Sequence, residues 1–381
     1  MGVWDELTGQ AEAIEVFSAA AAADAAGSAM THAWLITGPP GSGRSNLAYA
    51  FAAALLSRGP ADLDATERQV GARTHPDLGV LSTERVIISI DEVRQLVTSS
   101  QFSPSVGRFR AMIIEDADRM SERTSNVLLK ALEEPPPRTV WILCAPSEAD
   151  LIPTIRSRVR SVRLRVPSVD EVAELIVRRD GVDLSVATRA ARESQSHIGM
   201  AHRLATNDEA RERREQTLQI ALGIGTVGDA VRAAGVLLDL AGADAKAITE
   251  ERDAEERESA LRSLGIEPGG TIPAALRGQL KSLEEDQKRR ATRSLRDGLD
   301  RIMVDLLSLY RDILLLQLGA TTEPINLSIQ PELVAAGQKS TSARTLATMD
   351  AIAIARRRID GNVSPALALE AMLISTATNG S

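Results

Sequence analysis

Aromatic residues are scarce in this chain and make up only 2% of its 381 positions. Large aromatic side chains often dominate buried cores, so the cores here must be built from Leu, Val, Ile and Ala. The hydrophobic fraction of 44% is sufficient for that. A core of this composition favours helices and a small parallel sheet. The length indicates two or three domains.

Cysteine is nearly absent as well. The single cysteine, Cys144, excludes a disulfide framework within the chain and fits a reducing compartment. No apolar run approaches the roughly 20 residues that span a bilayer, and no signal-peptide pattern is present. We therefore expect a soluble cytoplasmic protein without a membrane partner. The net charge of −8 argues against a protein that coats nucleic acid, although a local basic patch is still allowed.

The segment 33–47 has the pattern of a strand, a glycine-rich loop and a helix start. Its loop matches the phosphate-binding spacing G-x-x-x-x-G-[basic]-S. Gly41 and Gly43 let successive backbone N–H groups turn inward, and the helix N-terminus that follows completes an anion site. The predicted nucleotide-binding residues are Gly38, Gly41, Ser42, Gly43, Arg44 and Ser45.

One position in this loop departs from the pattern. Arg44 stands where lysine is expected. The planar guanidinium of arginine does not contact the β- and γ-phosphates as the compact ammonium of lysine does. Ser45 stands where a hydroxyl would hold Mg²⁺. The loop is therefore compatible with ATP or ADP and Mg²⁺, whereas efficient hydrolysis is in doubt.

Two carboxylates follow the predicted buried strand Ala111–Ile114. In P-loop proteins such carboxylates handle Mg²⁺ and the attacking water. The usual order is Asp then Glu, but here Glu115 precedes Asp116. Each carboxylate is then displaced by about one methylene, a shift that can cost orders of magnitude in rate. Glu115 and Asp116 are candidates for a magnesium or water site, and a solvated acidic loop is the structural alternative.

The basic stretch from Ile155 to Arg165 has three interpretations. Arg156, Arg158 and Arg160 alternate and would share one face of an extended segment. They could form a phosphate groove for DNA, or supply an arginine finger to a neighbouring nucleotide. They could equally be the solvated edge of a sheet.

Three regions follow from the patterns along the chain. Residues 1–166 are predicted to form an α/β P-loop domain with a parallel sheet, although 57–77 reads as polar and irregular. Residues 167–207 are predicted to form a small helical lid, and 208–381 an all-helical domain. In the latter, 286–319 keeps helical spacing over a wide apolar face.

Several strings in the first region together resemble one family. They are His75-Pro76-Asp77, the acidic string Ile113–Met120, the segment Asn126–Pro136 with its Leu-Leu-Lys-x-Leu-Glu-Glu-Pro-Pro, and Thr154–Arg158. The chain resembles the clamp-loader subunits of bacterial DNA polymerase III, and within them the delta-prime subunits. The segment Asn126–Pro136 is the most specific part of this resemblance.

The resemblance implies an AAA+ protein with a RecA-like domain, a lid and a helical collar. It would sit in a heteropentameric ring with gamma/tau ATPase subunits and a delta subunit. Such a ring loads the sliding clamp on primed DNA, this subunit touching the clamp only indirectly. DNA polymerisation would belong to the whole complex.

The resemblance also assigns a role to Arg158. In this family a Ser-Arg-Cys motif supplies an arginine finger in trans, and the match here is Ser157-Arg158-Val159. Relatives usually bind zinc through four cysteines before the His-Pro-Asp string. The segment 57–74 has no cysteine, so we expect no zinc there, and no metal site besides the possible magnesium site described above.

Four positions are off the pattern of an active ATPase. They are Arg44, the Glu115-Asp116 order, Pro146 where a polar sensor is expected, and His202 near the position of the lid arginine. We therefore expect a subunit that stabilises the ring and hydrolyses little or no ATP itself. The alternative is an active gamma/tau-like ATPase subunit.

Overall fold

The computed structural model describes residues 4, 7–23, 30–83, 86–263 and 277–378. The chain divides into two compact units, Met1–Thr206 and Asn207–Ser381, which are taken one at a time below.

A five-stranded parallel sheet forms the centre of the first unit. Its strands are β1 (Ala33–Thr37), β2 (Leu78–Leu81), β3 (Arg110–Ile114), β4 (Thr139–Ala145) and β5 (Arg160–Arg163), in the spatial order β2-β3-β4-β1-β5. The central strands β1 and β4 are fully buried, whereas β5 is mostly exposed at one edge. The strand order reverses where β1 meets β4, and ligands of such sheets bind beyond the carboxyl ends of the strands at this point.

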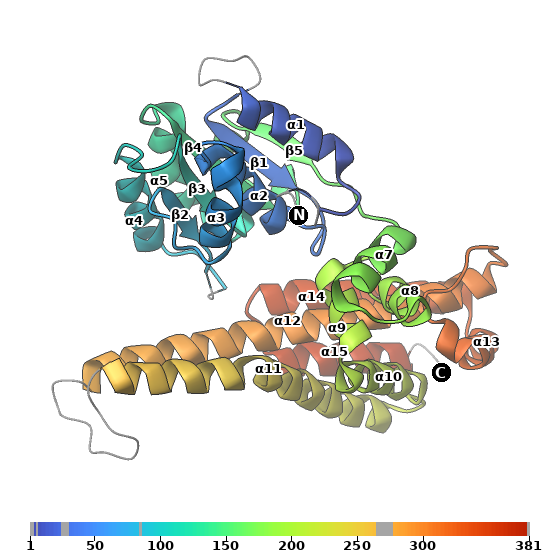
Figure 1. Cartoon of the computed structure of the whole chain (residues 1–381). Coiled ribbons are helices and arrows are strands. Elements are labelled where there is room, and N and C mark those ends of the chain that lie inside the picture. The colour runs from blue at the N-terminus through green and yellow to red at the C-terminus, as the bar shows by residue number, and fades with distance from the viewer. Residues whose placement is uncertain (1–3, 5–6, 24–29, 84–85, 264–276, 379–381) are drawn as a thin grey trace. The chain divides into compact units, whose positions relative to one another are not determined.

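Helices cover both faces of this sheet (Figure 1). One face carries α1 (Ala11–Ala22), α2 (Arg44–Leu56) and α3 (Pro60–Gly71), and the other carries α4 (Ile90–Ser100), α5 (Glu122–Glu133) and α6 (Pro153–Arg156). Successive strand residues alternate between the two cores, as the pleat requires. On β1, Trp34 and Ile36 enter the first core while Ala33 and Leu35 enter the second.

The first core contains a cluster of three aromatic rings. The Phe17 ring centroid lies 4.9 Å from that of Trp34 and 4.5 Å from that of Phe51, and the Trp34 and Phe51 centroids are 5.6 Å apart. All three side chains are fully buried. They join α1, β1 and α2 directly behind the glycine-rich loop, so they fix the two elements from which that loop emerges.

The prediction that residues 57–77 are irregular was wrong over α3. Gly59 precedes the helix and Pro60 occupies its first turn, where a missing N–H costs nothing. The helix buries only Thr66 and Val70. Two buried positions are too few to give a clear helical periodicity of apolar residues in the sequence.

Three helices end the first unit: α7 (Val169–Asp180), α8 (Leu184–Glu193) and α9 (Ile198–Thr206). Ser168 begins α7 with a capping box in which its hydroxyl accepts the Glu171 N–H. Gly181 ends the same helix in the left-handed conformation, which glycine adopts without strain. The parallel sheet with flanking helices, followed by these three helices, confirms the predicted α/β fold class.

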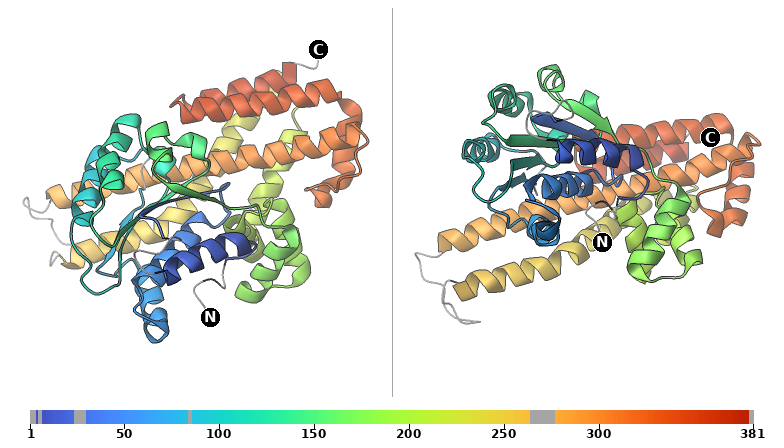
Figure 2. Two further views of the ribbon diagram at one scale, coloured as in Figure 1. Left: turned by 90° about the horizontal axis from the view of Figure 1, so that it is seen from above. Right: turned by 45° about the horizontal axis from the view of Figure 1, so that its top comes forward.

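The second unit is helical throughout its described part. It contains α10 (Asp208–Leu222), α11 (Val227–Ser263), α12 (Arg277–Gln317), α13 (Gln330–Lys339), α14 (Ser342–Asp360) and α15 (Pro365–Thr378), with a short 3₁₀ turn at Leu327–Ile329. The long helices α11 and α12 lie side by side in all three views (Figures 1 and 2). The helix predicted over 286–319 is confirmed as part of α12.

A buried carboxylate joins the C-terminal part of α12 to the segment that follows it. Asp312 is 0% exposed and accepts the backbone N–H groups of Ile325 (3.1 Å) and Asn326 (2.8 Å). The Asn326 side chain also donates to Asp312, at 2.9 Å. None of the helices in the described ranges is both long and apolar enough to cross a membrane.

Candidate functional site

The glycine-rich loop connects β1 to α2, as the sequence predicts. Gly41 (φ +79°) and Gly43 (φ +89°) are both left-handed, a conformation that side chains with a Cβ rarely adopt. The first N–H groups of α2 have no acceptor within the helix and therefore face the loop. Ser42 is 3% exposed, and its hydroxyl has no hydrogen-bond partner among the described residues. These features are typical of loops whose backbone N–H groups bind phosphate.

The side chain of Arg44 closes this loop rather than extending beyond it. Its Nη1 donates a hydrogen bond of 2.6 Å to the carbonyl oxygen of Gly38, at the start of the loop. The Gly38 N–H in turn donates to the carbonyl oxygen of Pro146, at 3.2 Å. The positive charge expected to follow the β- and γ-phosphates is therefore bound to the protein backbone in this arrangement.

A turn between α8 and α9 packs against the middle of the same loop. The Ile198 N–H donates to the Gly41 carbonyl oxygen at 3.3 Å, and a Cβ placed on Gly41 would come within 2.3 Å of the His197 ring. The turn contains two consecutive left-handed residues, Gln195 (φ +53°) and Ser196 (φ +62°). The sequence analysis missed His197, because no local signal predicts left-handed Gln and Ser.

The predicted carboxylate Glu115 lies at the carboxyl end of β3 but is already engaged. Its carboxylate accepts hydrogen bonds from the Tyr49 hydroxyl, from Arg73 Nη2 at 3.0 Å and from the Ser82 hydroxyl at 3.3 Å. Its side chain is 16% exposed. Burial, together with the bond to Glu115, raises the pKa of Tyr49. The same carboxylate cannot easily hold a metal ion or polarise water while these donors occupy it.

The second predicted carboxylate, Asp116, takes a different direction from Glu115. It is left-handed (φ +40°) and forms an ion pair of 3.5 Å with Arg119. Asp118, which the sequence analysis did not single out, lies nearby. Burial raises the pKa of Asp118, and the charge of Asp116 adds to this effect. Within the described part of the chain, no group of three or more His, Cys, Asp or Glu side chains could hold a metal ion.

His202, near the predicted position of the lid arginine, is engaged within the lid helices. Its Nδ1 lies 2.7 Å from Asp180 Oδ2 at the end of α7. It therefore pairs with α7 in this arrangement, and the structure gives it no contact with the phosphate loop.

The expected extended arginine segment is not extended. Pro153 starts the short helix α6, which ends at Arg156, and a turn separates it from Arg160 at the start of β5. Arg156, Arg158 and Arg160 thus do not share a strand face. The reason is Ile155, whose fully buried side chain anchors a helical turn where the alternation of arginines suggested a strand. The Arg160 guanidinium lies 5.0 Å from the centre of the Trp34 ring.

Arg158 lies in this turn with its guanidinium at the surface. Its Nε and Nη2 lie 2.7 and 2.6 Å from Glu133 Oε1, at the end of α5. Its Nη1 donates to the Thr154 carbonyl oxygen at 2.7 Å and to the Ser157 hydroxyl at 3.0 Å. The side chain remains 33% exposed. This is a preorganised cation that a neighbouring molecule can reach.

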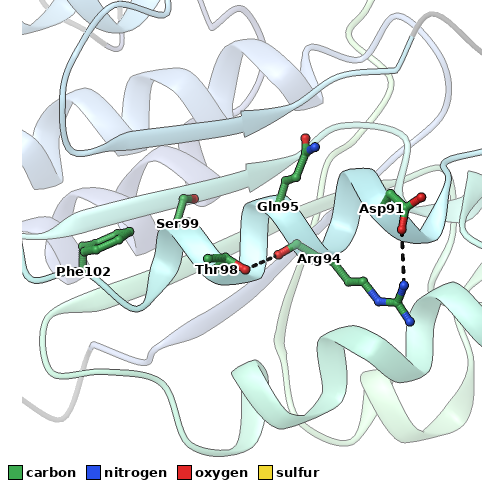
Figure 3. Close-up of a pocket in the computed structure, with 6 residues that line it drawn as sticks. All are labelled: Asp91, Arg94, Gln95, Thr98, Ser99 and Phe102. Carbon is green, nitrogen blue, oxygen red and sulfur yellow. Dashed lines mark hydrogen bonds and ion pairs between the residues drawn. The ribbon is translucent and has the colours of Figure 1, made fainter.

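A shallow cavity of about 570 Å³ lies on the outer side of α4 (Figure 3). It is lined by Asp91, Arg94, Gln95, Thr98, Ser99 and Phe102. Arg94 pairs with Asp91 at 3.2 Å, and Thr98 donates to the Arg94 carbonyl oxygen at 2.8 Å. None of these residues belongs to the phosphate loop or to the turn that carries Arg158.

The first unit is similar to known proteins. Residues 9–168 match the model of the family described as DNA polymerase III, delta subunit. DNA polymerase III subunit delta′ of Pseudomonas aeruginosa is 35% identical over 154 residues, which cover 39% of this chain and 47% of the relative. Residues 9–168 are therefore similar to the delta-prime subunits of the DNA polymerase III clamp loader. Its delta′ relative from Escherichia coli is 30% identical over 196 residues, covering 49% of this chain and 59% of that protein.

Subunits of a second kind are also similar to this chain. DNA polymerase III subunit gamma of Buchnera aphidicola is 30% identical over 146 residues, or 37% of this chain and 40% of the relative. The chain spans about half the length of the curated relatives it matches. A solved gamma subunit-related protein from Thermotoga maritima superposes with a TM-score of 0.43 at 17% identity, covering 92% of this chain and 95% of that one. That superposition is too weak to support an argument.

Proposed function

We propose that this chain is a delta-prime-type clamp-loader subunit that completes the ATP site of a neighbouring subunit with Arg158 and does not hydrolyse ATP at its own loop. The observation that carries the proposal is the contrast between two charged groups. Arg158 is held at the surface by Glu133, Thr154 and Ser157. Arg44 is bound to its own backbone at Gly38.

The exposed guanidinium has the chemistry of an arginine finger. Such a group stabilises the charge that develops on a γ-phosphate during transfer, and it works in trans when it projects from a subunit surface. Arg158 needs no rearrangement of its backbone to reach a partner, because it already lies at the surface of the turn. The Val at the position of the family cysteine leaves this chemistry unchanged, since the guanidinium alone carries it.

The chain's own loop supports phosphate binding but not turnover. Its backbone N–H groups suit ATP or ADP, and Ser45 lies where a hydroxyl would help to hold Mg²⁺. However, Arg44 is turned back onto Gly38, and Glu115 already accepts three hydrogen bonds. A nucleotide bound here would have a structural role.

The proposed partners follow from the same assignment. The chain would join gamma/tau ATPase subunits and a delta subunit in a heteropentameric ring in the cytoplasm. That ring would load the sliding clamp on primed DNA, and the polymerase activity would belong to the complete holoenzyme. Residues 1–166 would form the AAA+ domain, 167–207 the lid and 208–381 the collar.

ATP turnover of the chain alone and of the reconstituted complex tests the proposal. The complex would contain cognate gamma/tau and delta subunits, with clamp and primed DNA. We expect only background turnover from the chain alone. In the complex, Arg158→Ala should lower kcat by about a hundredfold or more. Arg156→Ala, in the same exposed segment, is the matched control and should have no effect.

Two results would contradict the proposal. Full turnover by the Arg158→Ala complex would remove the finger assignment. Turnover by the chain alone that disappears in Ser45→Ala would identify an active gamma/tau-like ATPase instead.

A further inference from the structure

We infer that Glu133 is a positioning residue for Arg158, fixing the plane of its guanidinium so that the remaining N–H faces a neighbouring subunit. The inference rests on the proposed function, because it assigns a second residue to the same trans site. It concerns a side chain at the end of α5, 25 positions before Arg158 in the sequence.

The hydrogen bonds define the orientation of the guanidinium. Glu133 Oε1 accepts from Nε of Arg158 at 2.7 Å and forms an ion pair with Nη2 at 2.6 Å. On the other edge, Nη1 donates to the Thr154 carbonyl oxygen and the Ser157 hydroxyl. A guanidinium has five N–H bonds in one plane. Four of them are directed by these contacts, which leaves one Nη2–H for an external phosphate oxygen.

The platform beneath this pair is rigid. Leu132 and Ile155 are both 0% exposed and belong to the same hydrophobic core, so α5 and α6 are packed against one another. The Arg158 N–H donates to the Ile155 carbonyl oxygen at 2.9 Å. Glu133 and Arg158 therefore project from two elements whose separation is set by the core.

Helix stability does not explain Glu133. It is the last residue of α5, where the partial negative charge of the helix end disfavours a carboxylate. The pair is also too exposed to contribute much to folding, since the Glu133 side chain is 46% and that of Arg158 33% exposed. The carboxylate is thus better explained by what it does to Arg158 than by what it does to the helix.

Positioning of this kind affects the transition state more than the ground state. An unrestrained arginine side chain samples many rotamers. Fixing one of them when the guanidinium contacts the transferring phosphoryl group costs conformational entropy. Glu133 removes part of that cost in advance. The affinity of the neighbouring site for ATP should depend on Glu133 much less than its turnover does.

The test uses the reconstituted complex with three variants of this chain. Glu133→Ala should lower kcat about fivefold to twentyfold and leave KM for ATP within about twofold, as expected for lost transition-state positioning. Glu133→Gln should lose less, because the amide oxygen still accepts from Nε and Nη2. Glu134→Ala, the exposed residue next along the chain, is the matched control and should behave as the unchanged protein.

A double-mutant cycle separates positioning from a general structural role. In an Arg158→Ala background, Glu133→Ala should cause no further loss, because its only target is gone. An additional loss there, an unchanged kcat for Glu133→Ala alone, or a faster turnover for that variant would each overturn the inference. If Arg158→Ala is inactive while Glu133→Ala is normal, only this inference fails. If Arg158→Ala is fully active, the proposed function itself fails.

Discussion

The phosphate loop and the Arg158 turn belong to the same unit but handle their charges in opposite ways. At the loop, Arg44 and Glu115 are satisfied by groups from within the chain, and the turn carrying His197 packs against Gly41. At the other site, the guanidinium of Arg158 is oriented by its neighbours but remains accessible. At the loop, Arg44 and Glu115 bind groups of the same chain. Arg158 also remains partly exposed to solvent.

Under the proposed function, this difference would let one fold contribute to a reaction without performing it. Arg44 and Glu115 already have partners within the chain, so the chain's own loop would not turn over ATP. Arg158 would act as a finger as long as the turn that carries it keeps its shape, which depends on the buried Ile155.

The largest expected effect separates charge from geometry at the accessible site. Arg158→Lys retains the positive charge but loses the planar fork that contacts Glu133, Thr154 and Ser157. We expect kcat of the reconstituted complex to fall about a hundredfold, which corresponds to about 2.7 kcal/mol in the barrier. Steady-state turnover with primed DNA measures this. If the lysine variant keeps full activity, charge alone suffices and the geometric contrast is lost.

A variant with lower stability is needed as a control for that comparison. Asp77 is 0% exposed and accepts N–H groups from Ser105 (2.6 Å), Val106 (2.7 Å) and Gly107 (2.6 Å). Asp77→Asn should lower the free energy of unfolding by about 2 kcal/mol, because charged hydrogen bonds are lost. Urea denaturation checks this. At a temperature where the variant is folded, turnover of the complex should be normal; a loss as large as that of Arg158→Lys would mean that turnover reports instability.

The pH dependence of stability follows from the same carboxylate. Burial by itself would raise the pKa of Asp77, but the backbone hydrogen bonds from residues 105–107 outweigh it and lower the pKa. Its contribution is therefore complete above the unfolded pKa of about 3.9 and is lost as the pH falls through the lower folded value. Urea midpoints measured between about pH 5 and pH 3 should fall for the unchanged protein more than for Asp77→Asn.

A smaller effect is expected at the self-engaged site. Tyr49→Phe removes the hydroxyl that donates to Glu115 but leaves the bonds from Arg73 and Ser82. Stability should fall by about 1 kcal/mol, measured by urea denaturation. Turnover of the complex should not change. A gain of turnover by the isolated variant would show that this hydrogen bond restrains an otherwise active site.

For Ser45→Ala we expect almost no change in the turnover of the complex. Ser45→Ala deletes the hydroxyl that would help to hold Mg²⁺, and turnover of the complex should stay within about twofold of the unchanged protein. The same substitution in a gamma/tau subunit is the positive control and should abolish turnover at that subunit's site. A large loss in the present chain would place its own loop in the catalytic cycle.

Much of the fold could be predicted because local patterns and tertiary structure agree. The apolar run of β3 is bounded by polar residues, and its predicted position agrees with the structure to within one residue. The glycines of the loop predicted its conformation for the same reason, since the left-handed backbone at Gly41 and Gly43 requires them. Short-range chemistry was sufficient at these positions.

The features that the sequence did not predict depend on contacts between residues far apart in the sequence. Glu115 meets Tyr49 from α2 and Arg73 from the turn after α3, and nothing in the sequence connects these three residues. The packing of His197 against Gly41 is a second example, 156 positions apart in the chain. Sequence spacing identified the carboxylate and the loop but could not tell which groups would already occupy them.

The alternating arginines illustrate a different failure. Alternation favours an extended strand only when nothing stronger acts on the backbone, and Pro153 with the buried Ile155 imposes a helical turn instead. The functional candidate nevertheless stays at the surface, because Arg158 follows that turn. The extended geometry assumed for this segment was wrong, and the role of Arg158 stays a prediction.

The aromatic cluster around Trp34 has a practical consequence for spectroscopy. All three tryptophans, at positions 4, 34 and 141, lie in the unit Met1–Thr206, and the only aromatic residue in Asn207–Ser381 is Tyr310. Intrinsic tryptophan emission therefore reports on the unit Met1–Thr206 alone, while far-ultraviolet circular dichroism reports on the helices of both units. Recording the two signals on one sample separates the unfolding of the two units without any label.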